Sequence, residues 1–173
     1  MKWECVTAVN SGVKIPGREN RAVGKKTVTF YRASHEASFG ADQQLLDQVH
    51  KSREVYLKEA DLNECQIIFV FCAINTRIES DMKAAMEQIP AGYKPVILVV
   101  MHHTRDIDFT TTRKKWKEKY EYVQLDVEVL FHGSEGGLLR CEKNKQAVEE
   151  IKNVLKENII QKRKKTGTRN KKR

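Results

Sequence analysis

Long apolar runs, paired cysteines and prolines are scarce in this chain of 173 residues. The longest apolar runs, at 67–74 and 95–101, fall far short of the ~20 residues that a membrane-spanning helix needs. The four cysteines include no CxxC pair, and the first residues lack the apolar segment of a signal peptide. We therefore exclude membrane-spanning, collagen-like and disulfide-scaffold proteins, and expect a reducing location, cytoplasmic or nuclear.

Several motifs of nucleotide and catalytic sites are also missing. The chain contains no GxGxxG, GxxxxGK[ST] or GxSxG sequence. The glycine-rich stretch 133–137 lacks the lysine of a phosphate-binding loop and is typical of a turn. No spacing of histidine, cysteine and carboxylate residues matches a metal motif. The sequence therefore predicts neither a cofactor nor a bound metal.

Acidic residues are absent from the C-terminal segment 162–173, whose eight basic residues account for all but one unit of the net charge of +9. The segment also has no apolar residue, which predicts a disordered tail. Such a tail suits nuclear import, contact with an anionic membrane surface, or nucleic-acid binding through counterion release. The basic residues are Lys162, Arg163, Lys164, Lys165, Arg169, Lys171, Lys172 and Arg173.

Apart from Gln66, the stretches 66–72 and 95–101 are apolar, which is typical of strands that are buried on both faces. Between them, apolar residues recur at helical spacing, which predicts a helix that ends before the glycine at Pro90-Ala91-Gly92. Strand, helix and strand together predict a βαβ unit with a right-handed crossover. The residues on the apolar face of that helix are Ile78, Met82, Ala85, Met86 and Ile89.

The segments before and after this unit continue the alternation of strands and helices. β-branched and aromatic residues predict a strand at 27–31, followed by an amphipathic helix. Residues 54–58 fit either a continuation of that helix or a second strand, and we favour the strand because α/β folds alternate their elements closely. Apolar and polar residues alternate at 123–131, which predicts an edge strand with one exposed face. Such a strand would be open to pairing in a dimer. The stretch 143–161 has the pattern of an amphipathic helix.

This order of elements predicts a flavodoxin-like α/β domain. The expected architecture is a doubly wound, mostly parallel sheet of about five strands with helices on both faces. The domain is expected to occupy residues 27–161, between an N-terminal extension at 1–26 and the tail at 162–173.

Ligands of such sheets bind beyond the carboxyl ends of the strands. After the strand at 66–72, the turn Asn75-Thr76-Arg77 leads into a helix N-terminus, whose free N–H groups favour an anion. The Arg77 guanidinium would suit phosphate or carboxylate, although the same residues also fit a plain helix cap and a surface ion pair. The candidate ligand-binding residues are Asn75, Thr76, Arg77, Glu79, His102, His103 and Thr104.

His102 and His103 close the strand that follows. Successive strand residues point to opposite faces, so both can bind one ion only where the strand has already ended. Either histidine would fit a general acid or base, and hydrogen bonding at a strand end would explain it structurally. Glu79 would orient a ribose in a nucleoside-processing enzyme, or simply complement the helix dipole.

Three stretches carry a resemblance to a known group of proteins. They read IFVFCAI at 68–74, PVILVVMHHT at 95–104, and VLFH followed by GLLRC within 129–141. The chain resembles small, largely uncharacterised proteins of bony fishes, which show VFCPI and VLVVMHHT strands and an LFH…GLL.C ending. The resemblance covers roughly residues 27–155, and it departs at Ala73, where proline is usual, and in both terminal segments.

The resemblance implies little about chemistry. It suggests a recurring framework and a loose association with inducible defence, and more distantly the layout is similar to Toll/interleukin-receptor-like and nucleoside-deoxyribosyltransferase-like domains. The framework residues are His102, His103, His132 and Cys141.

Three functions are consistent with these observations. The first is a non-enzymatic intracellular interaction or regulatory module that binds a protein partner, because no catalytic arrangement stands out. The second is a nucleotide-binding sensor or a nucleoside or NAD glycohydrolase-like protein, with a nucleotide-like anion held by the candidate residues. The third is nucleic-acid binding through the tail at 162–173.

Overall fold

The computed structural model of the chain describes residues 26–35, 37–51, 55–92, 94–112 and 115–169, with side chains as far as residue 160. These residues form one sheet of six strands in the order β2-β1-β3-β4-β5-β6. Pairing is parallel from β2 to β5, and β6 runs antiparallel to β5. The strands are β1 (Lys26–His35), β2 (Val55–Glu59), β3 (Ile67–Ile74), β4 (Val96–His103), β5 (Val123–His132) and β6 (Gly137–Leu138).

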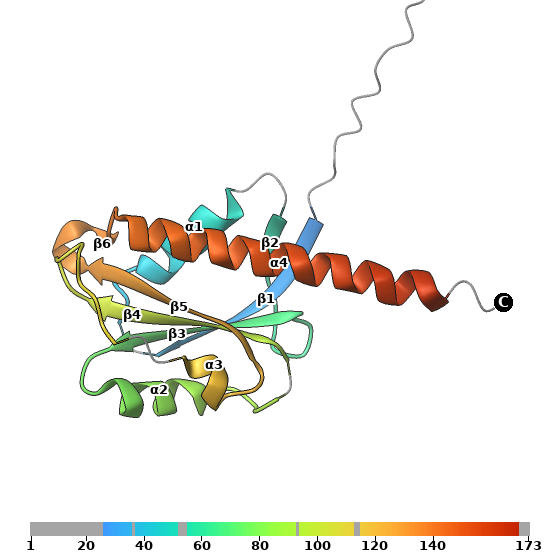
Figure 1. The fold of residues 1–173 in the computed structure, drawn as a ribbon, viewed down its shortest axis with the longest axis horizontal. Coiled ribbons are helices and arrows are strands. Elements are labelled where there is room, and N and C mark those ends of the chain that lie inside the picture. Colours follow the sequence, from blue (N-terminus) through green and yellow to red (C-terminus); the bar gives the residue numbers. More distant parts are fainter. Residues whose placement is uncertain (1–25, 36, 52–54, 93, 113–114, 170–173) are drawn as a thin grey trace, which may run out of the picture.

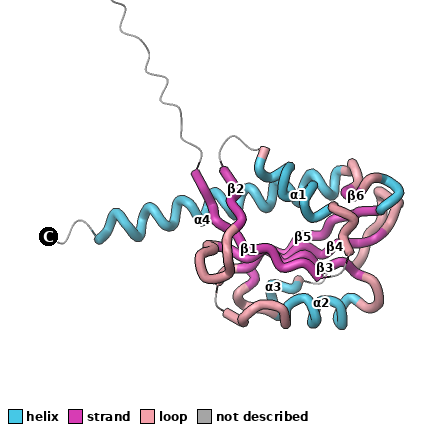
Figure 2. Tube along the Cα trace, turned by 180° about the vertical axis from the view of Figure 1, so that it is seen from behind, coloured by secondary structure: helices cyan, strands magenta, loops and turns pink. Residues whose placement is uncertain are grey.

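Helices cover both faces of this sheet. Helices α1 (Ala41–His50) and α4 (Glu142–Arg169) lie on one face, and α2 (Ile78–Met86) and the short α3 (Trp116–Lys119) lie on the other (Figure 1, Figure 2). The order 2-1-3-4-5 of the parallel strands is the flavodoxin-like order. The predicted fold class is therefore confirmed, with the two-residue β6 as an additional strand.

The central strands β3 and β4 contribute to two separate apolar layers. Ile67 and Phe69 of β3 pack with residues of α1 and α4, whereas Ile68 and Val70 pack against α2. This is the physical reason for the uninterrupted apolar runs in the sequence, because a strand covered on both faces has no wet side. Full burial of each such side chain stabilises the fold by about 1.5–3 kcal/mol.

The ambiguous segment after the first helix is a strand. Val55–Glu59 forms β2, which pairs in parallel with β1 from Lys26↔Val55 to Phe30↔Glu59. Helix α1 ends at His50, whose Nδ1 accepts a hydrogen bond of 3.3 Å from the backbone N–H of Leu57. The strand that we favoured is thus confirmed, and the helical alternative is wrong.

The outer edge of β5 is only partly closed by β6. The register pairs Phe131 with Leu138 and His132 with Gly137. Next to this pair, the buried Asn144 of α4 accepts a hydrogen bond from the Leu130 N–H and donates one to the Leu130 carbonyl, both at 2.8 Å. The Leu130 carbonyl also accepts from the Leu139 N–H at 3.0 Å, so Asn144 adds to the backbone pairing that continues after β6. The dimer through this edge stays a prediction.

Helix α4 runs further than the sequence pattern indicated. Its last residue is Arg169, so helical backbone continues through the first part of the predicted tail and extends past the sheet (Figure 1). Gln161 to Lys165 are all strong helix formers, and extending an existing helix costs little once a packed segment has nucleated it. The rest of the tail and the extension at 1–25 lie outside the described residues, and Lys26 belongs to β1.

Among the residues that the structure describes, no helix is long and apolar enough to cross a membrane. Cys65, Cys72 and Cys141 are free and buried, and Cys5 lies outside the described part. Burial, with a smaller contribution from the nearby carboxylate of Asp81, raises the pKa of the Cys72 thiol to about 12. This cysteine is therefore a thiol at neutral pH and acts as a small apolar side chain.

Candidate functional site

The turn after β3 is occupied by a carboxylate of the protein itself. Asp81, in the first turn of α2, is buried, and its Oδ2 accepts hydrogen bonds from the backbone N–H groups of Asn75 and Thr76, both at 2.9 Å. The Thr76 hydroxyl donates to Oδ1, also at 2.9 Å. Two of the candidate residues, Asn75 and Thr76, thus already bind an internal anion. A second negative charge would be repelled here.

The other candidate residues near this turn are exposed. Arg77 is the N-cap residue of α2 and makes no side-chain cap, and Glu79 lies in the first turn of that helix. The register pairs Ile74 of β3 with His102 of β4, so this turn is adjacent to the histidine pair. The candidate site nevertheless lies further along the edge of the sheet, at the ends of β4 and β5, where the guanidinium groups of Arg105 and Arg140 line a pocket.

The two histidines at the end of β4 are separated by the sheet. Strand β4 includes both residues, and the structure leaves His102 buried and His103 exposed, as the alternation of a strand predicts. His102 packs against the ring of Phe109, with 5.3 Å between ring centroids. Its Nε2 lies 3.7 Å from a carboxylate oxygen of Glu128 on β5. His102 therefore belongs to the interior of the protein.

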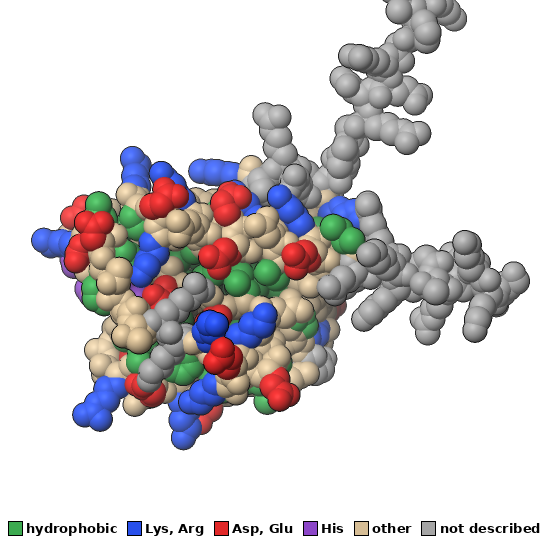
Figure 3. Space-filling model, in the orientation of Figure 1, with side chains coloured by type: hydrophobic (Ala, Val, Ile, Leu, Met, Phe, Trp, Pro, Cys, Tyr) green, Lys and Arg blue, Asp and Glu red, His purple; other side chains and the backbone are tan. Residues whose placement is uncertain are grey.

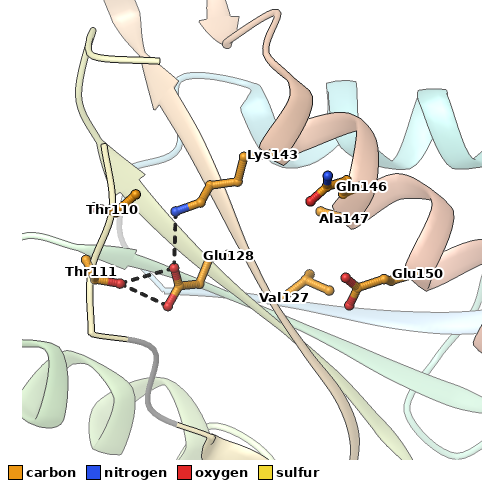
Figure 4. Close-up of a pocket in the computed structure, with 8 residues that line it drawn as sticks. All are labelled: Thr110, Thr111, Val127, Glu128, Lys143, Gln146, Ala147 and Glu150. Atoms are coloured by element: carbon orange, nitrogen blue, oxygen red, sulfur yellow. Dashed lines mark hydrogen bonds and ion pairs between the residues drawn. The ribbon is translucent and has the colours of Figure 1, made fainter. Parts of the chain in front are cut away.

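Glu128 is the centre of a charged network at the open edge of β5. The Thr111 hydroxyl lies 3.1 and 3.2 Å from its two oxygens, and Lys143 Nζ lies 3.4 Å from Oε2 (Figure 4). His102, and then Lys143 and Thr111, lower the pKa of Glu128 to about 2 against the opposing effect of burial. The 3.7 Å between His102 Nε2 and the Glu128 carboxylate is too long for a hydrogen bond, and this buried nitrogen has no hydrogen-bond partner among the described residues.

A pocket of about 230 Å³ opens beside this network, between the loop after β4 and helix α4 (Figure 4). Three of its polar side chains already contact one another, because Thr111 and Lys143 both point at Glu128. The lining residues are Thr110, Thr111, Val127, Glu128, Lys143, Gln146, Ala147 and Glu150.

Aromatic rings from three separate segments stack at the carboxyl edge of the sheet. His103 and His132 are parallel, with 4.5 Å between centroids and 4° between planes. Phe39, from the loop after β1, stacks on His103 at 5.7 Å and 22°. Phe131 packs beneath, 5.2 Å from His103. The stack ends in solvent, because 60% of Phe39 is exposed.

The outer part of this ring stack is bordered by positive charge. Arg105 Nε donates to His132 Nδ1 at 3.5 Å, and the Ser134 backbone N–H donates to the same nitrogen at 3.1 Å. A nitrogen that accepts hydrogen bonds carries no proton, so we place the His132 proton on Nε2. Desolvation, and then the charges of Arg105 and His103, lower the pKa of His132.

A second pocket, of about 380 Å³, continues from Arg105. It contains two guanidinium groups, those of Arg105 and Arg140, and one carboxylate, that of Glu135. We call Phe39, His103, Arg105, His132 and Arg140 the ring–arginine surface. In Figure 3 this end of the molecule, on the left, shows basic, histidine and hydrophobic side chains next to one another, with acidic side chains above them.

Sequence reasoning reached only part of this surface. It singled out His103 and Thr104 as candidates, and Thr104 lies at the base of the surface, where its N–H donates to the Phe131 carbonyl at 2.9 Å. It missed Phe39 and Arg140. The signal that could have found His132 is the strand order, because parallel neighbours end at the same edge and β4 pairs with β5. The side chains of the tail candidates are not described.

No three histidine, cysteine or acidic side chains within the described residues are grouped so that they could hold a metal ion. Comparisons of the chain with protein-family models, with curated proteins and with solved structures found no match.

Proposed function

We propose that this protein is a non-enzymatic binding module, and that the ring–arginine surface binds a nucleotide-like anion. The observation that carries the proposal is Phe39. Its backbone has a φ of 50°, in the left-handed region, and its ring is exposed at the edge where ligands of this fold class bind. This conformation is rare for bulky residues and costs of order 1–3 kcal/mol, which a functional role would explain.

The backbone around Phe39 supports this arrangement. Gly40 follows with a φ of 78°, so two successive left-handed residues turn the ring back over the strand ends. The ring lies above Gly133, where an added Cβ would approach Phe39 Cδ1 to 3.3 Å. Glycine at 133 thus leaves the space in which the Phe39 ring lies against His103.

The surface offers the groups that a nucleotide requires. An exposed ring stack provides a face for a nucleobase, and stacking of one base on an aromatic side chain contributes about 1–3 kcal/mol. Arg105 and Arg140 supply guanidinium forks for a phosphate group. The carboxylate of Glu135 in the same pocket accepts hydrogen bonds from hydroxyl groups, which suits a ribose.

The titratable groups favour binding without turnover. A carboxylate with a pKa of about 2, such as Glu128, is a weak base at neutral pH. A thiol with a pKa of about 12, such as Cys72, is a poor nucleophile. Asp81 is engaged by the turn that it caps, and Glu79 is exposed on α2. A sensor is therefore better supported than a glycohydrolase.

The test is a titration of the labelled protein with AMP, adenosine and inorganic phosphate, followed by amide chemical shifts. We expect AMP to shift the amide signals near residues 39–40, 103–105, 132–134 and 138–140. Adenosine alone and inorganic phosphate alone should each bind more weakly than AMP. Phe39→Ala should lower AMP affinity at least fivefold, by the loss of about 1 kcal/mol of stacking. Tyr56→Ala is the matched control, because Tyr56 is an exposed aromatic on β2 at 43%.

Three results would overturn the proposal: no shift with AMP, shifts elsewhere, or an equal loss of affinity in both variants. If the surface instead binds a protein partner, Phe39→Ala should abolish binding of that partner, and AMP should not compete with it. The exposed apolar side chain of Ile107, near Arg105, is the feature that would favour a protein partner.

The helical extension of α4 favours nucleic-acid binding as a second candidate function. The helix carries Lys162, Arg163, Lys164, Lys165 and Arg169 beyond the sheet (Figure 1). Clustered basic residues bind phosphates without sequence preference and with strong salt dependence. Import into the nucleus would need the same residues. Binding of the purified protein to nucleic acid in vitro separates the two roles, because import does not require it.

A further inference from the structure

We propose that Glu128 and Lys143 form a latch that holds the loop after β4 in place and so positions Arg105 for the ligand. The inference deepens the proposed function and rests on it, because the loop supplies one of the two arginines of the ring–arginine surface. The loop runs from residue 104 to residue 112 and connects β4 towards α3. Glu128 and Lys143 would be positioning residues, since neither belongs to the surface itself.

The far end of the loop is attached to two other elements by charged contacts. Lys143, in the first turn of α4, donates from Nζ to the backbone carbonyl of Phe109 at 3.1 Å and lies 3.4 Å from Glu128 Oε2. The Thr111 hydroxyl donates to the same carboxylate from the loop side (Figure 4). One carboxylate therefore holds together the loop, β5 and α4.

The interior supports the latch from below. The Phe109 ring packs on buried His102 and joins Leu130, Leu139 and Cys141 in a small apolar cluster. The side chain of Glu128 is only 11% exposed, so water screens its attraction to Lys143 weakly. Charge-assisted hydrogen bonds in such a setting are stronger than neutral ones.

The near end of the loop carries the ligand-facing groups. Thr104 bonds to the Phe131 carbonyl, and the next residue, Arg105, reaches His132 and lines the pocket of about 380 Å³ with Ile107 and Arg140. Arg140 stands on the segment between β6 and α4, two residues before α4 begins. The latch thus connects the loop that carries Arg105 to the start of α4, which follows Arg140. It therefore fixes the distance between the two arginines across the pocket.

Hydrogen exchange of the loop amides tests the latch without any ligand. In Glu128→Gln, which keeps the shape and removes the charge, we expect faster exchange at Asp108 and Phe109, whose N–H groups bond within the loop to Asp106. Exchange in β3 should stay unchanged. Glu149→Gln is the matched control, because it removes the same charge from a carboxylate that pairs with Lys152 on the surface of α4.

Ligand affinity then tests the functional half of the inference. A loop that is in place for about one fifth of the time raises the apparent Kd for AMP about fivefold. We expect that loss in Glu128→Gln and in Lys143→Met, and no larger loss in the double variant, since both changes break one latch. The control Glu149→Gln should bind AMP as the original protein does.

The outcomes separate the two proposals. Unchanged loop exchange in Glu128→Gln overturns the latch, whether or not AMP binds. Faster loop exchange with unchanged AMP affinity overturns the positioning of Arg105. Faster loop exchange in a protein that binds no AMP at all overturns the proposed function and leaves the loop contact as a structural one.

Discussion

The amide side chain of Asn144 should be one of the most important polar groups for stability. It is 2% exposed, and it makes three hydrogen bonds to backbone groups. Oδ1 accepts from the Leu130 N–H at 2.8 Å, and Nδ2 donates to the Leu130 carbonyl at 2.8 Å and to the Leu139 carbonyl at 2.7 Å. These bonds join α4 to β5 and to the residue that follows β6, Leu139, which lines the pocket of the ring–arginine surface.

Asn144→Ala removes all three bonds and leaves buried backbone groups without these partners. At about 1 kcal/mol for each hydrogen bond, the free energy of unfolding should fall by about 3 kcal/mol. For a domain of this size the midpoint of thermal unfolding falls by about 2–4 °C per kcal/mol, so we expect a decrease of about 6–12 °C.

Urea unfolding followed by circular dichroism measures this free energy, and a thermal scan gives the midpoint. Asn158→Ala is the control on the same helix, because Asn158 is half-buried and bonds only one described side chain, that of Gln124 at 3.0 Å. It should change the free energy of unfolding by less than about 0.5 kcal/mol. A loss below about 1 kcal/mol in Asn144→Ala, or equal losses in the two variants, would refute the reasoning.

Three further predictions concern charged groups. Asp81→Asn should lower the free energy of unfolding by about 1.5–3 kcal/mol in urea, because the turn at Asn75 and Thr76 loses a charged acceptor; a neutral result would contradict the proposed role of Asp81. The depressed pKa of Glu128 contributes stability that is complete above about 4.5 and is lost as pH falls towards about 2, so its carboxyl carbon should still show the ionised shift in NMR at about pH 3.5. Deletion of 162–173 should abolish binding to single-stranded RNA in a filter assay, and binding by the full chain should weaken steeply with added salt; retained binding after the deletion excludes the tail as the contact.

The sequence pattern was sufficient for the main elements and their order, although it did not predict the two-residue β6. The apolar stretches at 66–72 and 95–101 predicted central strands, because a strand covered on both faces has no exposed position, and β3 and β4 confirm this. The choice of a strand at 54–58 followed from the alternation of the fold, and β2 confirms it. The end of α4 was less predictable, because helix formers without apolar residues fit either a tail or a continued helix.

The candidate site depended on partners that local patterns do not reveal. Asn75 and Thr76 have the sequence of an anion-binding turn, yet a carboxylate six and five residues later occupies it. No local rule distinguishes an Asp81 that complements a helix dipole in solvent from one that folds back onto the turn. That choice depends on burial, which packing of α2 on the sheet imposes.

By itself, the amino-acid sequence determined the class of the fold, since hydrophobic periodicity and strand–helix alternation are local properties of the chain. Only the tertiary structure decided which side chains meet. Phe39 follows β1, and His103 and His132 are the last residues of β4 and β5. These rings stack because the sheet order brings the ends of the three strands to one edge. Contacts between segments so far apart along the chain depend on how the whole sheet closes, which no single segment encodes.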